Sequence, residues 1–428
     1  MKIQLPLRRE QRTLKNGMHV ILIQKEGFAK SLFMLGIPAG GINITDQIGD
    51  QIVSHPHGCA HYLEHQMFRL NGQDVTYALA QAQAKTNAAT GYDETSYFVW
   101  TNASPYEPLK LLIDFVQTLE ITPETVEKER GIILSEYSQY DQEPESRLLI
   151  ETFKSMYHNH PMREEILGTP EDISKISVED LEQFYQTWYD PAQLVLVGVT
   201  GHDLDDLFDF IEQQEENYPS KVQHLAKRIL PSEPCEVLQQ SKTLHMDIDL
   251  PYTCVGVKLD VHAEDAWHYV RDDYMMNLWL NSRFESMNPE FQNWIDSHLI
   301  GGLCGAEADL AKDHGYILIY AQTNDPDRFI QVVKEELKAK TPISKEVFES
   351  LLIREKASSI RLCERFEALA SQSVGGYFKG YDPLEDLNVL ESIHLEDVNA
   401  FIQNLNMEQM STTTILPLES LNQDEAND

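Results

Sequence analysis

Apolar positions in the first half of the chain recur with two different periods, one typical of strands and one typical of helices. Short runs of mainly apolar residues, bounded by glycine, proline or asparagine, predict strands at Met18–Leu22, Ser31–Ile37 and Leu194–Val199. Two further runs, Thr86–Thr90 and Ser96–Thr101, are separated by a short polar stretch that contains glycine. We therefore expect these two runs to form a β-hairpin.

Between these strands, apolar residues three and four positions apart predict helices. Leu109, Leu112 and Phe115 share one face of a helix predicted over Pro108–Leu119. A second helix should begin at Thr122, because a capping residue is followed there by proline and an acidic residue. A further helix should carry the stretch 57–65, another should pass through 77–80, and a third should span 172–187.

The second half of the chain repeats the first. Residues 343–349 align with residues 121–127 at an offset of 222, and residues 393–398 align with residues 176–181 at an offset of 217. The later pair of segments leads in each case to a final strand. The sequence thus predicts a duplicated α+β unit.

This repeat and a basic, proline-punctuated stretch together suggest the domain boundaries. We expect an N-terminal domain at 1–218, a linker at 219–236, a homologous C-terminal domain at 237–418 and an acidic, disordered tail at 419–428.

Composition excludes several classes of function. The 428 residues carry a net charge of −35, which disfavours nucleic acids and anionic membranes as partners. The five scattered cysteines include no C-x-x-C pair, so neither a disulfide framework nor a cysteine zinc site is expected. No signal peptide and no bilayer-spanning run is apparent, so we expect a cytoplasmic protein without a membrane span.

One short motif carries the candidate chemistry. His61, Glu64 and His65 form an H-x-x-E-H pattern, and on a helix all three would fall on one face. Two imidazoles one turn apart can bind a single zinc ion, which lowers the pKa of a bound water to about 7. Glu64 would accept the proton of that water and pass it to the leaving amine. The motif is the inverse of the H-E-x-x-H pattern of zinc proteases.

A third ligand must come from another element, and Glu136 is the best candidate. Glu129 lies seven residues earlier, so on a helix both carboxylates face the same way; one could bind metal while the other orients a ligand. His57 also lies four residues before His61, but we interpret it as a loop residue. We interpret Cys59 as a packed thiol.

The chain resembles zinc peptidases of the pitrilysin/insulinase family, and most closely the short bacterial cytosolic members. That family has H-x-x-E-H followed some seventy residues later by a glutamate, and here 136 − 65 = 71. Matching segments occur at Leu14–Met18, Thr86–Thr90 and Trp188–Pro191. The resemblance implies two similar domains, each a mixed, mostly antiparallel sheet flanked by helices. It also implies one Zn²⁺ per chain, bound by His61, His65 and Glu136, and catalytic roles for Glu64 and Glu129.

The resemblance also implies how substrate and partner bind. An extended peptide would add as a strand beside Thr86–Thr90, where Asn87 and Ala88 would contact it. Family members of this length pair two chains around a closed chamber, so we expect a homodimer, or a heterodimer with a related subunit that lacks the zinc motif. Cleavage of peptides or unfolded segments would follow, including maturation of a ribosomally made peptide. The alternative is a non-catalytic scaffold subunit, because the stretch 294–303 lacks the arginine and tyrosine that the family places there.

Overall fold

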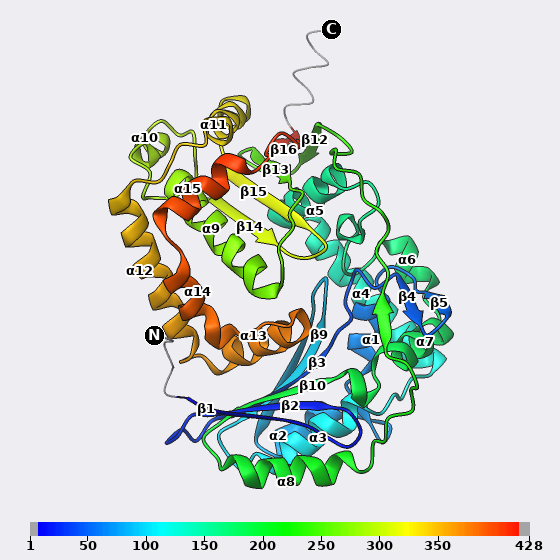
Figure 1. Cartoon of the computed structure of the whole chain (residues 1–428). Helices are drawn as coiled ribbons and strands as arrows, with labels where there is room; N and C mark the ends of the chain where they lie inside the picture. Colours follow the sequence, from blue (N-terminus) through cyan, green and yellow to red (C-terminus); the bar gives the residue numbers. More distant parts are fainter. Residues whose placement is uncertain (1–6, 419–428) are drawn as a thin grey trace. The chain divides into compact units, whose positions relative to one another are not determined.

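A computed structural model describes residues 7–418 of the chain (Figure 1). Its contacts divide the chain into two compact units, which are described separately below. The first unit comprises the described residues up to Tyr137 together with Glu164–Leu230 and Arg361–Leu384. The second comprises Ser138–Arg163, Pro231–Ile360 and the described residues from Glu385 onward.

These units differ from the predicted domains 1–218 and 237–418, which are contiguous in sequence. The first unit includes a segment from the second half of the chain, and the second unit includes 138–163 from the first half. Each of these segments supplies a helix that covers an apolar sheet face. The chain leaves the first unit for the second time after Leu230, within the predicted linker 219–236. The predicted tail 419–428 lies outside the described residues.

The first unit is built on a six-stranded sheet in the order β1-β2-β10-β3-β9-β8. Only β2 and β10 pair in parallel, so this sheet is mixed and mostly antiparallel, as predicted. The strands span Arg8–Thr13 (β1), His19–Gln24 (β2), Ser31–Ile37 (β3), Ala84–Thr90 (β8), Thr95–Thr101 (β9) and Val195–Thr200 (β10). Alternation of side chains gives this sheet two apolar faces, and helices cover both.

Most helices of the first unit pack on one face of the sheet. They span Cys59–Gln66 (α1), Val75–Gln81 (α2), Tyr106–Val116 (α3), Pro123–Asp141 (α4, of which the last residues belong to the second unit), Pro170–Lys175 (α6), Val178–Trp188 (α7) and Leu204–Glu215 (α8). The other face, with Met34 and Val197, is covered by α13 (Phe366–Lys379) through Leu369, Ala370 and Val374 (Figure 1).

Two small sheets complete the first unit. They are formed by β11 (Ala226–Arg228), β4 (Thr45–Ile48) and β5 (Gln51–Ser54), and by β6 (Arg69–Leu70) and β7 (Gln73–Asp74).

The second unit repeats the sheet of the first. Its five strands have the order β12-β16-β13-β15-β14, in which β12 and β16 are parallel and the later pairs are antiparallel. This order matches β2-β10-β3-β9-β8, so the structure confirms the duplicated α+β fold. The strands span Ser241–Met246 (β12), Tyr252–Lys258 (β13), Cys304–Leu310 (β14), Gly315–Gln322 (β15) and Met410–Pro417 (β16).

Helices of the second unit also follow the predicted repeat. The aligned segments at 343–349 and 393–398 begin α12 and α15, as 121–127 and 176–181 begin α4 and α7. The helices span Pro144–Met156 (α5), Ala266–Phe284 (α9), Phe291–Asp296 (α10), Pro326–Ala339 (α11), Lys345–Leu362 (α12, of which the last two residues belong to the first unit), Asp386–Ser392 (α14) and Leu395–Asn404 (α15).

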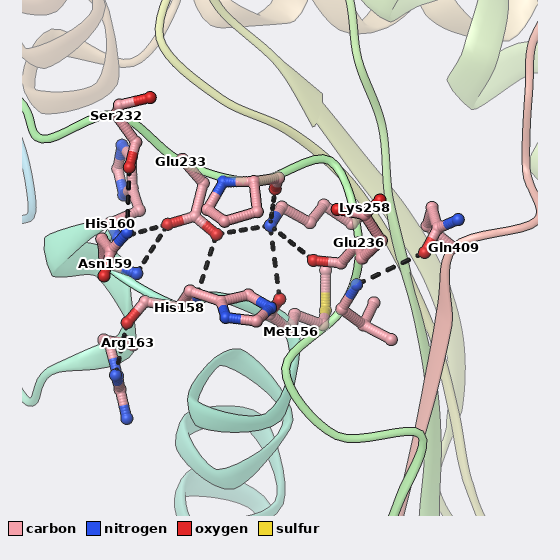
Figure 2. Close-up of polar contacts among 12 residues, drawn as sticks. Met156, His158, Asn159, His160, Arg163, Ser232, Glu233, Glu236, Lys258 and Gln409 are labelled. Atoms are coloured by element: carbon pink, nitrogen blue, oxygen red, sulfur yellow. Dashed lines mark hydrogen bonds and ion pairs between the residues drawn. The ribbon is translucent and has the colours of Figure 1, made fainter.

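One carboxylate fixes two crossing segments within the second unit (Figure 2). Glu233 accepts backbone N–H bonds from His158, Asn159 and His160 at 2.8, 2.7 and 2.7 Å, and it pairs with the buried Lys258 of β13. Burial raises the pKa of Glu233, but these donors outweigh burial and hold the pKa below its ordinary value. The segment after α5 and the end of the predicted linker are therefore joined by charge-assisted bonds.

Candidate active site

The motif helix α1 begins at a position that requires glycine. Gly58, its N-cap, has a φ of 83°, and a Cβ there would lie 2.2 Å from the carbonyl oxygen of Leu167. The helix starts at Cys59, so His57 lies in the preceding turn, as predicted. Leu63 and Ala60 of α1 face the core, which leaves the motif side chains on the adjoining face.

The two motif histidines meet a carboxylate from α4. His61 Nε2 and His65 Nε2 lie 3.7 and 3.4 Å from Glu136 Oε2. One ligand atom from each of these three residues lies within 4.8 Å of the others, and within residues 7–418 no other three histidine, cysteine or acidic side chains meet in this way. Neither His57 nor Cys59 belongs to the group.

These separations fit a zinc ion. Zinc–nitrogen and zinc–oxygen bonds of roughly 2.0–2.1 Å in a tetrahedron place neighbouring ligand atoms about 3.3 Å apart. The observed 3.4 and 3.7 Å are near this value and too long for good hydrogen bonds. Burial, and next the neighbouring His65, lower the pKa of His61 to about 3, so its ring is neutral at neutral pH. A neutral imidazole is the form that binds zinc.

Glu129 approaches the same histidine pair from its other side. Its Oε2 lies 3.5 Å from His65 Nδ1, the nitrogen that does not face Glu136. Glu129 and Glu136 thus project from one face of α4, two turns apart, as their spacing predicted. A carboxylate in this place can fix the orientation of a metal-binding imidazole.

Two side chains that sequence reasoning missed hold α1 against α4. The Tyr62 hydroxyl donates to the carbonyl of Val126 at 2.5 Å, and Gln66 Nε2 donates to the carbonyl of Thr125 at 3.3 Å. Each follows a motif histidine by one position, so the same four-residue spacing that places the histidines also places this second pair. That spacing could have indicated that both side chains face α4, but it does not identify the carbonyl groups to which they bond.

Glu64 projects towards the edge strand β8. Thr90 Oγ1 donates to Glu64 Oε2 at 2.5 Å, a length typical of a hydroxyl bound to a carboxylate. Burial raises the pKa of the Glu64 carboxyl, while the bond from Thr90 and the neighbouring His65 act in the opposite direction. The hydroxyls of the buried Tyr97 and Tyr189 bond to each other at 2.9 Å.

The outer edge of β8 is free of strand pairing within the described sheet. Opposite residues of an antiparallel pair alternate between hydrogen-bonded and non-bonded pairs. Gly91 N–H donates to Glu94 O at 2.8 Å at the hairpin end, so Ala89 and Asn87 bond to β9 in turn. Thr86, Ala88 and Thr90 alternate with these residues, so their backbone N–H and C=O groups face away from β9.

Asn87 and Ala88 lie differently with respect to this edge. Asn87 pairs with Phe98, whose side chain belongs to the sheet face covered by α13, whereas Ala88 pairs with Tyr97 on the opposite face. The Asn87 carboxamide still reaches the edge, because its Oδ1 accepts the N–H of Ala88 at 3.0 Å. The structure therefore brings the Asn87 carboxamide to the edge-facing amide of Ala88, while Thr90 makes the contact with Glu64.

Comparison with protein families decides the membership of the chain. The family model described as Insulinase (Peptidase family M16) matches residues 24–170. A second model, described as Peptidase M16 inactive domain, matches residues 175–352. The chain belongs to peptidase family M16. Within this M16 chain, the first model covers the motif, both glutamates of α4 and the β8–β9 hairpin.

Individual relatives resemble this M16 chain along most of its length. A Bacillus subtilis protein described as an uncharacterized zinc protease, YmfH, is 28% identical over 408 residues, which cover 94% of this chain and 95% of the relative. The mitochondrial-processing peptidase subunit beta of Neurospora crassa is 22% identical and covers 91% of this chain and 83% of its own length. The crystal structure of an M16-like peptidase from Alicyclobacillus acidocaldarius has a TM-score of 0.92 at 27% identity, covering 97% of this chain and all of that one.

The segments Leu14–Met18 and Trp188–Pro191, which also carried the resemblance, have structural roles in this M16 chain. Trp188 Nε1 donates to the buried Asp46 at 2.7 Å, and Tyr189 forms the hydroxyl pair with Tyr97. Gly17 has a φ of 93° and lies against Ala192, where a side chain would clash. Within residues 7–418, every helix is too short or too polar to cross a lipid bilayer.

Proposed function

We propose that this chain is a zinc-dependent endopeptidase that binds one Zn²⁺ through His61, His65 and Glu136. The observation that carries the proposal is the convergence of three donor side chains at zinc-like separations, next to a partly buried carboxylate and an open strand edge. When bound, zinc would polarise the scissile carbonyl and lower the pKa of the attacking water.

The remaining chemistry falls to side chains of the first unit. Glu64 would take a proton from the attacking water and deliver it to the nitrogen of the leaving amine, so that water and one peptide bond yield a carboxyl and an amine. Burial of Glu64 favours proton uptake by raising its pKa. Glu129 would orient the His65 ring through Nδ1.

The edge of β8 would bind the substrate as an added strand. Main-chain groups of Ala88 and its edge-facing neighbours would pair with an extended peptide, which gives affinity without reading its sequence. The Asn87 carboxamide would leave the Ala88 N–H and bind the incoming peptide instead. Most strands of a folded protein are already paired, so the substrates would be peptides or unfolded segments.

Three further features belong to the same proposal. The chain would act as a homodimer, or as a heterodimer with a related subunit that lacks the zinc motif; in support, relatives are named as subunits of the mitochondrial-processing peptidase. Two chains would enclose the site in a chamber. The protein would work in the cytoplasm, and one use would be the maturation of a ribosomally made peptide.

The test compares metal content with cleavage. Wild-type protein purified without chelator should contain about one zinc per chain, and it should cleave fluorescently quenched casein, an unfolded substrate, until a chelator is added. Glu64→Gln should retain the zinc and lose about 10²–10⁴-fold in rate. Glu107→Gln, which changes an exposed glutamate on α3, is the matched control and should behave as wild type.

Two outcomes would contradict this proposal. A chain that binds no zinc would remove the metal site. Full zinc occupancy without cleavage of casein, even together with a related subunit, would favour the non-catalytic scaffold instead.

A further inference from the structure

Two threonines on β8 face the same way but hold different partners. Thr86 and Thr90 lie four residues apart on one strand, so their side chains project from the same face. The Thr86 hydroxyl donates to the carbonyl of Phe98 at 3.0 Å, on the neighbouring strand. The Thr90 hydroxyl instead donates to Glu64 Oε2 at 2.5 Å. Of the two, only Thr90 joins the edge strand to the motif helix.

The bond from Thr90 distinguishes the two oxygens of Glu64. The terminal torsion of a glutamate side chain is broad and nearly two-fold, so an unrestrained carboxylate presents either oxygen. A hydroxyl bonded to Oε2 restrains this torsion and leaves Oε1 to accept a proton. The bond is short and charge-assisted, which makes it stronger than a neutral hydrogen bond.

We infer that Thr90 is a positioning residue that holds Glu64 ready for proton transfer. This inference rests on the proposed peptidase function, because it assigns Glu64 the proton-transfer role. Thr90 itself does not accept the proton of water; it acts through the carboxylate, by fixing which oxygen is presented to the attacking water.

The same residue also links the base to the substrate-binding edge. The backbone N–H and carbonyl of Thr90 face away from β9, where an added peptide strand would pair, while its side chain bonds to Glu64. One residue therefore fixes both the register of the peptide and the orientation of the base. Removal of the hydroxyl leaves the backbone groups in place, so binding should persist while the chemical step slows.

The experiment compares four zinc-loaded variants of the full chain: Thr90→Val, Thr90→Ser, Thr76→Val and Glu64→Gln. The substrate is a quenched peptide taken from the casein fragments that wild type produces. We expect Thr90→Val to lower kcat about 10- to 100-fold with KM within about twofold of wild type. Thr90→Ser restores the hydroxyl and should recover kcat to within about threefold. Thr76→Val, the matched control, removes an exposed hydroxyl on α2 that donates to the Asp74 carboxylate at 2.5 Å, and it should leave both constants within about twofold.

Two measurements do not depend on activity. Zinc content should stay at the wild-type value in Thr90→Val, because Thr90 touches no proposed ligand. Crystal structures of zinc-loaded wild type and Thr90→Val should show the Glu64 carboxylate ordered in the first and rotated or in two conformers in the second.

Contrary outcomes separate this inference from the proposed function. If wild type cleaves and Glu64→Gln does not, a kcat of Thr90→Val equal to wild type overturns the inference alone, as does an equal loss in Thr76→Val. If wild type does not cleave casein at all, the proposed function fails. The crystal structures then still decide whether Thr90 orients Glu64, and an unmoved carboxylate in Thr90→Val would overturn that point.

Discussion

The edge strands β8 and β14 occupy the same place in the two matching sheets, but only β14 has its edge-facing backbone groups bonded to a packed helix. Within residues 7–418, the edge-facing backbone of β8 meets only the Asn87 carboxamide, a side chain of the strand itself. In β14 the edge-facing amides are bonded to side chains of a packed helix. Ala308 donates to Asn277 Oδ1 at 3.2 Å and accepts from Asn277 Nδ2 at 3.3 Å, while Leu310 N–H donates to Asp273 at 3.2 Å.

The helix that closes β14 stands where the motif helix stands in the other unit. In chain order α9 lies between β13 and β14, as α1 lies between β3 and β8. Asp273 and Asn277 are one turn apart, as are His61 and His65. In the second unit, the pair on α9 bonds to the edge of β14. In the first unit, the histidine pair on α1 meets Glu136. Exposed edges invite strand addition, and of these two matching edges only that of β8 is left open to it within residues 7–418.

The helices that follow show the same divergence. Under the repeat offset of 222, Glu136 corresponds to Ser358 and Glu129 to Leu351 on α12. Leu351 is buried in the second unit, whereas Glu129 reaches His65 in the first. The first copy therefore carries the groups that we propose to bind metal and transfer protons, whereas the matching positions of the second copy hold a buried leucine and a serine.

The largest expected effect comes from removing the carboxylate that distinguishes the two copies. Glu136→Gln should lower zinc affinity by at least about 100-fold and abolish measurable cleavage, because it replaces a charged ligand with a neutral amide. Ser358→Ala makes the matched change in the second copy and should leave both properties unaltered. Zinc titration against a competing chelator gives the affinity, and an unchanged affinity in Glu136→Gln would remove Glu136 from the ligand set.

A smaller effect should follow from blocking the open edge. Ala88→Pro removes an N–H that faces away from β9, so no bond of the existing sheet is lost. We expect KM for the quenched peptide to rise about fivefold to tenfold, the equivalent of one hydrogen bond, with zinc content unchanged. Ala88→Ser keeps the N–H and should bind as wild type. A folded Ala88→Pro protein with unaltered KM would show that substrates do not pair with this strand.

The smallest effect on catalysis should come from opening the closed edge. Asn277→Ala removes both bonds to Ala308 and should destabilise the second unit by about 1–2 kcal/mol. Urea unfolding measures this loss, and Asn293→Ala, an exposed position with only a local bond, is the control. Peptide cleavage should stay within about twofold of wild type. A large fall in cleavage at normal zinc content would contradict the assignment of peptide binding to β8 alone.

The features that depend on local periodicity could be predicted from the sequence. Spacing within one helix placed His61, Glu64 and His65 on one face, and the seven-residue spacing of the two α4 glutamates placed them on another. The offsets of 222 and 217 revealed the duplication, because repeated helices keep their caps and apolar faces. Family resemblance supplied the pairing of the motif with Glu136.

The contacts made between distant segments could not be predicted. The alternation of side chains along 84–90 places Thr86 and Thr90 on the same face of the strand. It does not indicate that Thr90, rather than Thr86, bonds to Glu64, because that depends on which residues of other segments lie next to each hydroxyl. An amphipathic helix likewise shows that it has an apolar face but not which sheet that face covers. For this reason the sequence did not predict that α5 covers the sheet of the second unit and that α13 covers the sheet of the first.

The exchange of covering helices limits how the chain can be divided. A protein ending at residue 218 would lack α13, and the apolar side chains of Met34, Phe98 and Val197 would be left exposed to water. A protein beginning at residue 219 would likewise lack α5, which packs on β13 and β16. The two halves therefore cannot be expressed separately without exposing an apolar sheet face in each.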